Sequence, residues 1–380
     1  MTTLALASRQ LGVAVAEPLS GGGSGAVTAA GTDRAGRPVV IKLLRSRPGA
    51  VDGHDLDTFR AKQHQLRLLG DLAPQIAARY PATIDAVHGE GWSAYVFDRL
   101  AGVSAVDAAA ALPAPDGARL LARAWSVLCA EGYAYGQRRT GRGLWETIYL
   151  DRIPRRMNVL REHLPELADA EHLTVNGRRI PGLAAVHEQA RAAGRPFEHT
   201  TLAAPVHGDL NLGNMILPHD ADPQALRLID PRGVLNAFDP LYDLAKMLFS
   251  LTLFEQAMTG GYKIARDAPG VWRVAPATAN RHAATGAATI AAADVFAASA
   301  NAAGLETTGW TARWLLAHAT HVLAEAPCRL SDHAQPLPVR RNRAAGLLLC
   351  GLLLMHDLLE RLRRREPLDA AHLAALNFGA

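Results

Sequence analysis

Cysteine is scarce in this sequence, since its 380 residues include only three cysteines. Cys129, Cys328 and Cys350 stand far apart, and no CxxC pair occurs. Zinc knuckles and disulfide-stapled folds need closely spaced, paired cysteines, so the sequence argues against both. We expect the three thiols to be reduced and buried as small apolar groups.

A long apolar segment is also missing. The longest apolar run covers residues 344–355, which is too short for a bilayer span of about 20 residues. His356, Asp357 and Glu360 follow it directly, and the N-terminus lacks a cationic stretch ahead of an apolar one. The pattern predicts a buried core helix, no membrane partner and a cytoplasmic location.

Neither sign of charge is in large excess. The 40 basic and 36 acidic residues give a net charge of +4, which is too small to indicate a nucleic-acid partner. Hydrophobic residues make up 49% of the chain, enough for a sizeable core. At about 150 residues per domain, the length suggests two or three compact units, and the oligomeric state stays open.

The first hundred residues are rich in predicted strands. Two apolar stretches meet at the turn 32–37, and two more flank the turn 88–91. Between these pairs, residues 55–73 have apolar positions at helical spacing, with Gly70 near the expected helix end. The patterns predict a small antiparallel sheet with one helix, ending near residue 100.

Alanine and leucine recur at helical spacing from Ser104 onward. A short exception at 173–182 is typical of a hairpin with Asn176-Gly177 at its turn. The predicted fold class is therefore α+β. We expect a small antiparallel-sheet N-lobe over residues 1–100 and a large, mainly helical C-lobe over residues 101–380.

The most informative residues for chemistry lie between positions 206 and 233. Asp209 and Asn214 are five positions apart on a predicted loop, and Asp230 follows a short apolar strand. A carboxylate base, an amide oxygen and a second carboxylate can hold Mg²⁺ on a triphosphate and orient a hydroxyl for in-line attack. The spacing of Asp209 and Asn214 equals that in protein-kinase catalytic loops.

The same stretch resembles a known family. HGDLNLGN at 207–214 and IDPRG at 229–233 resemble motifs of the aminoglycoside phosphotransferase and choline kinase group of small-molecule kinases, as does FDPLYDLAK at 238–246. The IDPRG form looks more like a less-studied bacterial branch of that group. The resemblance covers roughly residues 19–249 and implies a protein-kinase-like bilobal fold.

This resemblance implies roles for single residues. Asp209 would be the catalytic base, and Asn214 and Asp230 would bind Mg²⁺. Three residues would support the loop from behind by hydrogen bonds: His207, Asp239 and Asp243. Arg232 would contact phosphate or substrate, or pair with a nearby acid.

The N-terminal sheet would supply the nucleotide site. Lys42 resembles the strand lysine that contacts the α- and β-phosphates of ATP. The glycine-rich segment 21–25 would cover the phosphates, although it lacks the GK[ST] ending of a P-loop. Residues 95–102 resemble the hinge strand that pairs with adenine. The implied ATP contacts are Gly22, Gly23, Ser24, Gly25, Lys42, Asp98 and Leu100.

One departure from the family pattern concerns the helix after Lys42. The family pairs this lysine with a helix glutamate, but residues 62–65 read Lys-Gln-His-Gln. Asp55 or Asp57 could substitute, or Gln65 could accept one hydrogen bond from Lys42. A weaker lysine clamp would allow another phosphoryl donor such as GTP.

The predicted activity is ATP-dependent transfer of the γ-phosphate to a hydroxyl of a small molecule. The acceptor would be sugar-like, aminoglycoside-like or a biosynthetic intermediate, and segments 141–156 and 262–272 are the expected walls of its site. These walls are not acidic, which favours a neutral or anionic acceptor over a polycation. A pseudokinase or nucleotide-sensing module is the alternative, and a protein kinase is a weaker one because no APE-type segment follows IDPRG.

Overall fold

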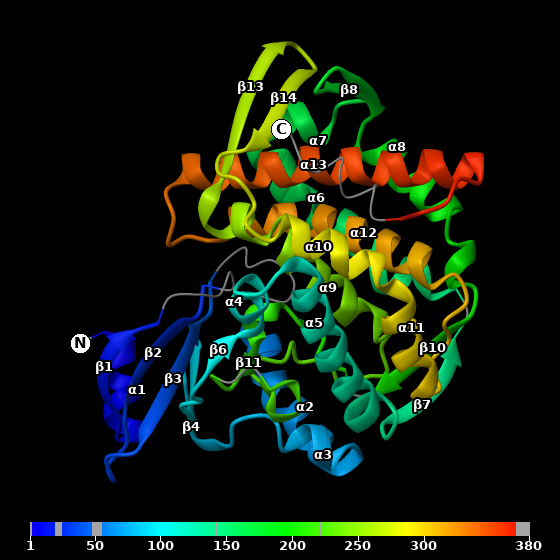
Figure 1. Cartoon of the computed structure of the whole chain (residues 1–380). Helices are drawn as coiled ribbons and strands as arrows, with labels where there is room; N and C mark the ends of the chain where they lie inside the picture. The colour runs from blue at the N-terminus through cyan, green and yellow to red at the C-terminus, as the bar shows by residue number, and fades with distance from the viewer. Residues whose placement is uncertain are drawn as a thin grey trace.

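The computed structural model describes residues 2–19, 25–47, 55–141, 143–204, 206–219 and 222–369. An antiparallel sheet near the N-terminus lies beside a larger, mainly helical part (Figure 1). This arrangement confirms the predicted α+β class. Three of the predicted nucleotide contacts, Gly22, Gly23 and Ser24, lie outside the described residues.

The N-terminal sheet has five antiparallel strands in the order β1-β2-β3-β5-β4. Both predicted hairpins are present, because β2 pairs with β3 and β4 pairs with β5. Helix α1, which begins at an N-cap formed by Thr2, was not predicted. The elements of this part are α1 (Thr3–Leu11), β1 (Ala14–Pro18), β2 (Val27–Thr32), β3 (Pro38–Arg45), α2 (Leu56–Leu72), α3 (Pro74–Ala77), β4 (Thr83–Gly89) and β5 (Trp92–Asp98).

Strand β3 has one face in the apolar core of the sheet and the other face toward a cavity. Val39, Ile41 and Leu43 are buried and pack in one cluster with the residues of α1. Side chains alternate along a strand, so Val40 and Lys42 project from the opposite face. Both line a cavity between the sheet and the helical part.

Helix α2 follows the sequence pattern closely. It begins after Asp55, whose carboxylate accepts a hydrogen bond from the backbone N–H of Thr58 at 2.7 Å. It ends at Leu72, because Pro74 disfavours helical backbone at Ala73. Gly70 therefore lies in the last turn, as predicted.

The remaining elements are mostly helices with short strands between them. The strands form sheets in the orders β12-β11-β6, β10-β7 and β13-β14-β8-β9. The elements are β6 (Val103–Ser104), α4 (Ala105–Ala110), α5 (Ala114–Leu128), β7 (Gln137–Gly141), α6 (Arg152–His163), α7 (Pro165–Ala168), β8 (His172–Val175), β9 (Arg178–Pro181), α8 (Leu183–Ala192), β10 (Thr200–Ala204), β11 (Met215–Leu217), β12 (Arg227–Leu228), α9 (Leu241–Thr252), β13 (Tyr262–Ala268), β14 (Val271–Pro276), α10 (Ala283–Ala291), α11 (Ala293–Ala302), α12 (Trp310–Leu330) and α13 (Leu337–Arg364).

Two hairpins in this part bear on the sequence predictions. The β8–β9 hairpin turns at Asn176 and Gly177, both with positive φ, as the Asn-Gly pair predicts. Segment 262–272, expected as a wall of the acceptor site, forms most of the β13–β14 hairpin, and β14 pairs in parallel with β8. No strands were predicted for this segment, whose two strands pair with each other and, through β14, with a strand almost 100 residues earlier in the chain.

The core of the helical part surrounds the long helices α12 and α13, which run side by side (Figure 1). The apolar run 344–355 is buried inside α13, and the three cysteines are free and buried, as predicted. Among the described residues, no single helix has the length and hydropathy of a membrane span. The bent pair α10 and α11 reaches that level only when both helices are taken together, across a bend of 56°.

Candidate functional site

The loop after Val206 turns sharply between His207 and Asp209. Gly208 has φ of +77°, and a Cβ there would come within 2.8 Å of Val234 Cγ2. Only glycine fits such a left-handed and crowded position without strain. The turn brings Asp209 and Asn214 together, because Asn214 Nδ2 donates a hydrogen bond to the backbone oxygen of Asp209 at 2.8 Å.

Helix α9 holds this loop with three polar side chains on one face. Asp243, Lys246 and Ser250 are spaced i, i+3 and i+7, so they project in the same direction. Asp243 Oδ2 accepts from the N–H of His207 at 3.0 Å, and its Oδ1 accepts from the N–H of Gly208 at 2.7 Å. Lys246 Nζ lies 2.8 Å from Asp209 Oδ1, and Ser250 Oγ accepts from the N–H of Leu212 at 2.9 Å. Every residue of α9 is buried, which makes these contacts a rigid support.

Asp243 has a third donor, the hydroxyl of Tyr133 at 2.9 Å. Burial raises the pKa of Asp243 to about 7, although the three hydrogen bonds favour its charged form. The loop at 207–209 is therefore held by a buried carboxylate, and the three donors offset the free-energy cost of removing that carboxylate from water.

We expect Asp243→Ala to lower the free energy of unfolding by about 3 kcal/mol, because three buried donors lose their acceptor. Tyr133→Phe removes one of these bonds and should cost about 1 kcal/mol. Urea denaturation of both variants measures the difference. Equal losses in the two variants would show that Asp243 does not hold the loop through its backbone contacts.

His207 is a buried, neutral brace of the loop. Its Nδ1 accepts a hydrogen bond from the N–H of Asp209 at 3.1 Å, so its Nε2 carries the proton and donates to the backbone oxygen of Ile229 at 2.9 Å. Burial lowers the pKa of His207 to about 4, so the ring remains neutral near pH 7. The ring thereby ties the Asp209 loop to the strand that leads to Asp230.

Asp230 stands between two lysines. Lys42 Nζ lies 2.6 Å from Oδ2, and Lys62 Nζ lies 2.5 Å from Oδ1. Burial raises the pKa of Asp230, but the two ammonium groups lower it more, and the net pKa lies well below the usual range. Asp230 also has φ of +56°, a left-handed conformation that is uncommon outside glycine.

These contacts correct the expected partners of Lys42. Its carboxylate partner is Asp230, whereas Asp55 caps α2 and Gln65 contacts other groups. Gln65 is fully buried and donates to the backbone oxygens of Val206 and His207. Its Oε1 accepts from the N–H groups of Gly233 and Val234 at 2.5 and 3.0 Å. Gln65 thus joins α2 to both functional loops instead of to Lys42.

The predicted chemical residues share one cavity of about 600 Å³ between the sheet and the helical part. Lys42, Asp209, Asn214, Asp230 and Arg232 all line it, together with Asp98 and Leu100 at the end of β5. Gly25 is not among its lining residues, and its carbonyl oxygen accepts a hydrogen bond from Arg47 at 3.4 Å.

Asp239 lies away from the loop at 207–214. Its Oδ2 accepts from the hydroxyl of Tyr149 at 2.8 Å and lies 3.4 Å from Arg313. Its Oδ1 accepts from the N–H of Leu241, at the start of α9. Of the two aspartates named for loop support, Asp243 makes these contacts and Asp239 anchors α9 instead.

Of the two expected acceptor walls, one reaches the cavity. Segment 141–156 contributes Arg152 and Arg156, whereas no residue of segment 262–272 lines it. The reason is that the second segment forms the β13–β14 hairpin, which packs against α13 and β8.

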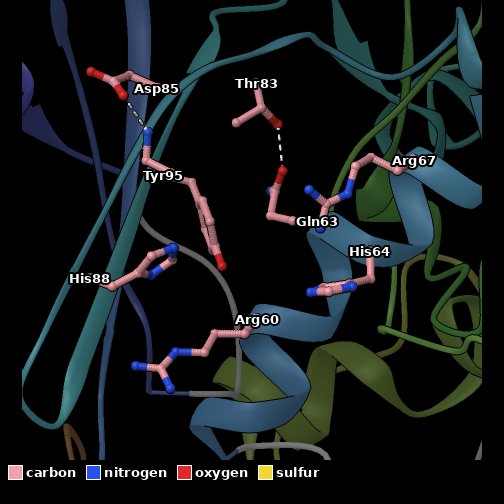
Figure 2. Close-up of a pocket in the computed structure, with 9 residues that line it drawn as sticks. Arg60, Gln63, His64, Arg67, Thr83, Asp85, His88 and Tyr95 are labelled. Atoms are coloured by element: carbon pink, nitrogen blue, oxygen red, sulfur yellow. Dashed lines mark hydrogen bonds between the residues drawn. The ribbon is translucent and has the colours of Figure 1, made fainter.

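A second hollow of about 650 Å³ lies on the outer side of α2, against β4 and β5. Figure 2 shows Arg60, His64 and Arg67 of α2 opposite His88 and Tyr95 of these strands. None of the predicted site residues lines it. Arg60 Nε donates to Ser93 Oγ at 2.9 Å, which attaches α2 to the sheet.

Two residues of the site, Lys62 and Lys246, were missed as functional groups, and Gln65 was assigned the wrong partner. A sequence signal exists for each, because each is a polar residue on an apolar helical stripe. Lys62 and Gln65 lie between Phe59 and Leu69 on the buried side of α2, and Lys246 follows Asp243 by one turn on the fully buried α9.

Comparison with known proteins gives structural likenesses only. No protein-family profile and no curated protein sequence matches the chain. Among solved structures, a type VIII aminoglycoside-3'-phosphotransferase is 22% identical, with 67% of this chain and 83% of that chain covered and a TM-score of 0.41. Amicoumacin kinase in complex with AMP-PNP, Ca²⁺ and Ami is 11% identical, with 95% and 92% covered and a TM-score of 0.49. The GDP complex of aminoglycoside 2'-phosphotransferase-IIIa is 13% identical, with 93% and 94% covered and a TM-score of 0.44.

These neighbours are named as kinases or phosphotransferases that act on small molecules. Their identities lie below 25% and their TM-scores below 0.5, so these likenesses assign no role to single residues of this chain.

Proposed function

We propose that the protein transfers the γ-phosphate of ATP to a hydroxyl of a small molecule. The observation that carries this proposal is the meeting of Asp209, Asn214 and Asp230 in one cavity with Lys42 and Lys62. A carboxylate free to take a proton, two oxygen ligands for a cation and two ammonium groups for phosphates are the parts that phosphoryl transfer needs.

Asp209 is placed to receive the acceptor's proton. Among its described contacts, Lys246 and Asn211 both reach Oδ1, at 2.8 and 3.0 Å, which leaves Oδ2 for a substrate hydroxyl. Burial raises the pKa of Asp209, but Lys246 lowers it more, so the carboxylate stays ionised near neutral pH. The acceptor oxygen forms a bond to the γ-phosphorus, the bond from that phosphorus to the β–γ bridging oxygen breaks, and the proton passes to Asp209.

The oxygens of Asn214 and Asp230 fit a magnesium ion. Asn214 uses its Nδ2 to donate to Asp209, so its Oδ1 is the atom available to a cation. Mg²⁺ takes hard oxygen ligands and usually binds through one or two carboxylates together with substrate phosphates. When bound, it would neutralise charge on the phosphates, while the lysines hold the triphosphate next to Asp230.

The sheet side of the cavity suits a purine. Apolar side chains line it on both sides: Leu19, Val40, Phe97, Leu100, Ile216 and Ile229. Residues 98–100 lie at the end of β5, where backbone groups would pair with the base, so Asp98 and Leu100 remain proposed nucleotide contacts.

A screen of hydroxylated metabolites with ATP and Mg²⁺, read by ³¹P NMR and by phosphate mass gain, tests this function. Phosphorylation of a small hydroxyl compound by the wild-type chain supports it. Nucleotide binding without transfer to any compound favours the nucleotide-sensing alternative, and transfer only to a generic protein favours a protein kinase.

Lys62 should compete with a divalent cation for Asp230. We expect Lys62→Met to bind Mn²⁺ several-fold more tightly in the absence of nucleotide, because one positive charge beside the carboxylate is gone. The same variant should bind ATP more weakly, since it lacks a phosphate contact. Mn²⁺ titration by EPR measures the first effect. Lys263→Met, on the exposed side of β13, is the matched control and should change neither affinity; unchanged Mn²⁺ affinity in Lys62→Met would contradict the expectation.

A further inference from the structure

The end of the cavity beyond Asp209 carries excess positive charge. Its cationic lining residues come from α6, from the loop after β12, from α9 and from α12: Arg152, Arg156, Arg232, Lys246 and Arg329. Among the described residues, the acids lining this end are Asp209 and Glu325. Five cations against two carboxylates leave a net charge of +3 in a largely buried space.

Arg152 is the clearest sign of this excess. It is only 7% exposed, and its Nη1 donates to the phenol oxygen of Tyr242. Among the described residues, its Nε has no hydrogen-bond partner, and no carboxylate is among the main charged groups that act on its guanidinium. Burial of an arginine without an anion is costly, and it lowers the pKa of Arg152 to about 10, with Arg232 adding to the shift.

The pKa values of two neighbouring side chains, Tyr242 and His321, are shifted by the same positive charges. The phenol oxygen of Tyr242 accepts hydrogen bonds from Arg152 and also from Arg232, the latter at 2.6 Å. Burial raises the pKa of Tyr242, but Arg152 and Arg232 lower it more. Burial lowers the pKa of His321 well below its usual value, and Lys246 and Arg152 lower it further.

Resting on the proposed phosphotransfer, we propose that the acceptor is an anion: a hydroxyl compound whose carboxylate or phosphate group binds at Arg152 and Arg156. Guanidinium groups recognise both anions through paired N–H donors. Both arginines line the same cavity as Asp209. Lys246 lies between Asp209 and α12, because its Nζ pairs with Asp209 at 2.8 Å and approaches Glu325 at 3.9 Å. Like charge disfavours a polycationic acceptor at the same place.

The arginines are separate from the expected path of the triphosphate. Lys42 and Lys62 lie on the sheet side, where both contact Asp230. Asp209 stands between the two groups, since its charge acts on Lys42 and its carboxylate pairs with Lys246. Lys42 and Lys62 would therefore bind the phosphates of the nucleotide, and Arg152 is not needed for that contact.

A matched set of acceptors tests the proposal. Glucose, glucuronate, glucose 6-phosphate and glucosamine share one scaffold and differ in charge. We expect kcat/KM for a carboxylate or phosphate member to exceed that for glucose by about 30-fold or more, the scale of a buried charge pair. The two anionic members also show which anion is preferred. Faster turnover of glucose or glucosamine would overturn the anionic class while leaving the phosphotransfer intact.

Variants of α6 assign the effect to Arg152. Arg152→Gln should remove most of the preference for the anion and leave the KM for ATP within a few-fold, while Arg152→Lys should retain part of it. Arg155→Gln is the matched control, because Arg155 projects from the same helix into solvent with its side chain 63% exposed. A preference that survives in a folded Arg152→Gln would overturn the assignment.

If none of the four sugar acceptors is phosphorylated, a binding measurement tests the anion site directly. Sulfate is titrated by calorimetry into the protein saturated with Mg²⁺ and a non-hydrolysable ATP analogue, which occupies the nucleotide phosphate positions. Saturable sulfate binding that is lost in Arg152→Gln and kept in Arg155→Gln supports the anion site even if the phosphotransfer proposal fails its own screen. Absent sulfate binding, or equal binding in all variants, overturns it.

Discussion

Asp209→Asn is expected to lower kcat for phosphoryl transfer by about 10²–10⁴-fold, the scale of acid–base catalysis. The amide has the shape of the carboxylate but cannot take the acceptor's proton. It also leaves Lys246 without the negative charge that it contacts at 2.8 Å. The KM for ATP should change by a few-fold only, because Lys42, Lys62 and Asp230 remain. Single-turnover kinetics with saturating ATP measure the chemical step directly.

The control for this variant is Asp71→Asn, an exposed position in the last turns of α2. It changes the net charge equally and should leave kcat unchanged. Thermal unfolding of both variants verifies that the loop is intact, since Asp243 and His207 still hold the backbone at Gly208 and Asp209. A folded Asp209→Asn that turns over at the wild-type rate would remove Asp209 from its proposed role.

The parts of the site that depend on short-range spacing could be predicted from the sequence. The loop that carries Asp209 and Asn214 begins with a turn that requires glycine at position 208. The sequence His-Gly-Asp at 207–209 has glycine at that position. The strand that carries Lys42 was predictable as well, because three consecutive β-branched residues, Val39, Val40 and Ile41, precede it. The two N-terminal hairpins and α2 follow from turn residues and helical spacing for the same reason.

The partners of Lys42 and Lys62 could not be predicted in this way. The contact of Lys62 with Asp230 depends on how α2 docks against the loop after β12, 168 residues away, and the contact of Lys42 depends on how β3 lies against the same loop. That docking is set by Gln65, which bonds to the backbone around His207 and Gly233. A single sequence shows that Gln65 lies on an apolar stripe, but the backbone groups that it meets belong to the tertiary structure.

The excess of cations beyond Asp209 was only partly visible in the sequence. Arg152 and Arg156 are one turn apart on α6, so they lie on one face of that helix. Their burial, and the arrival of Arg329 from α12, require the packing of α6 against α12. The sequence favoured a neutral or anionic acceptor, and the buried arginines narrow this proposal to an anionic one.

Asp230→Asn is expected to abolish the Mg²⁺-dependent part of nucleotide binding and to lower kcat by about 10²–10³-fold, the scale of losing one preorganised electrostatic contact. The amide keeps the shape of the side chain and tolerates the left-handed backbone at φ of +56°. It loses the negative charge that would hold a divalent cation and that two lysines now share. Calorimetric titration of ATP with and without Mg²⁺ measures the effect.

The wild-type protein in EDTA is the matched control for Asp230→Asn, because it keeps the carboxylate and lacks the cation. If Asp230 acts through a cation, the variant with Mg²⁺ and the wild type in EDTA should bind ATP with similar affinity. If Asp230 instead serves only to pair the lysines, the variant should unfold more readily, yet its ATP affinity should still respond to Mg²⁺. A Mg²⁺ response equal to that of the wild type would contradict the cation role and leave Asp230 as a partner of Lys42 and Lys62.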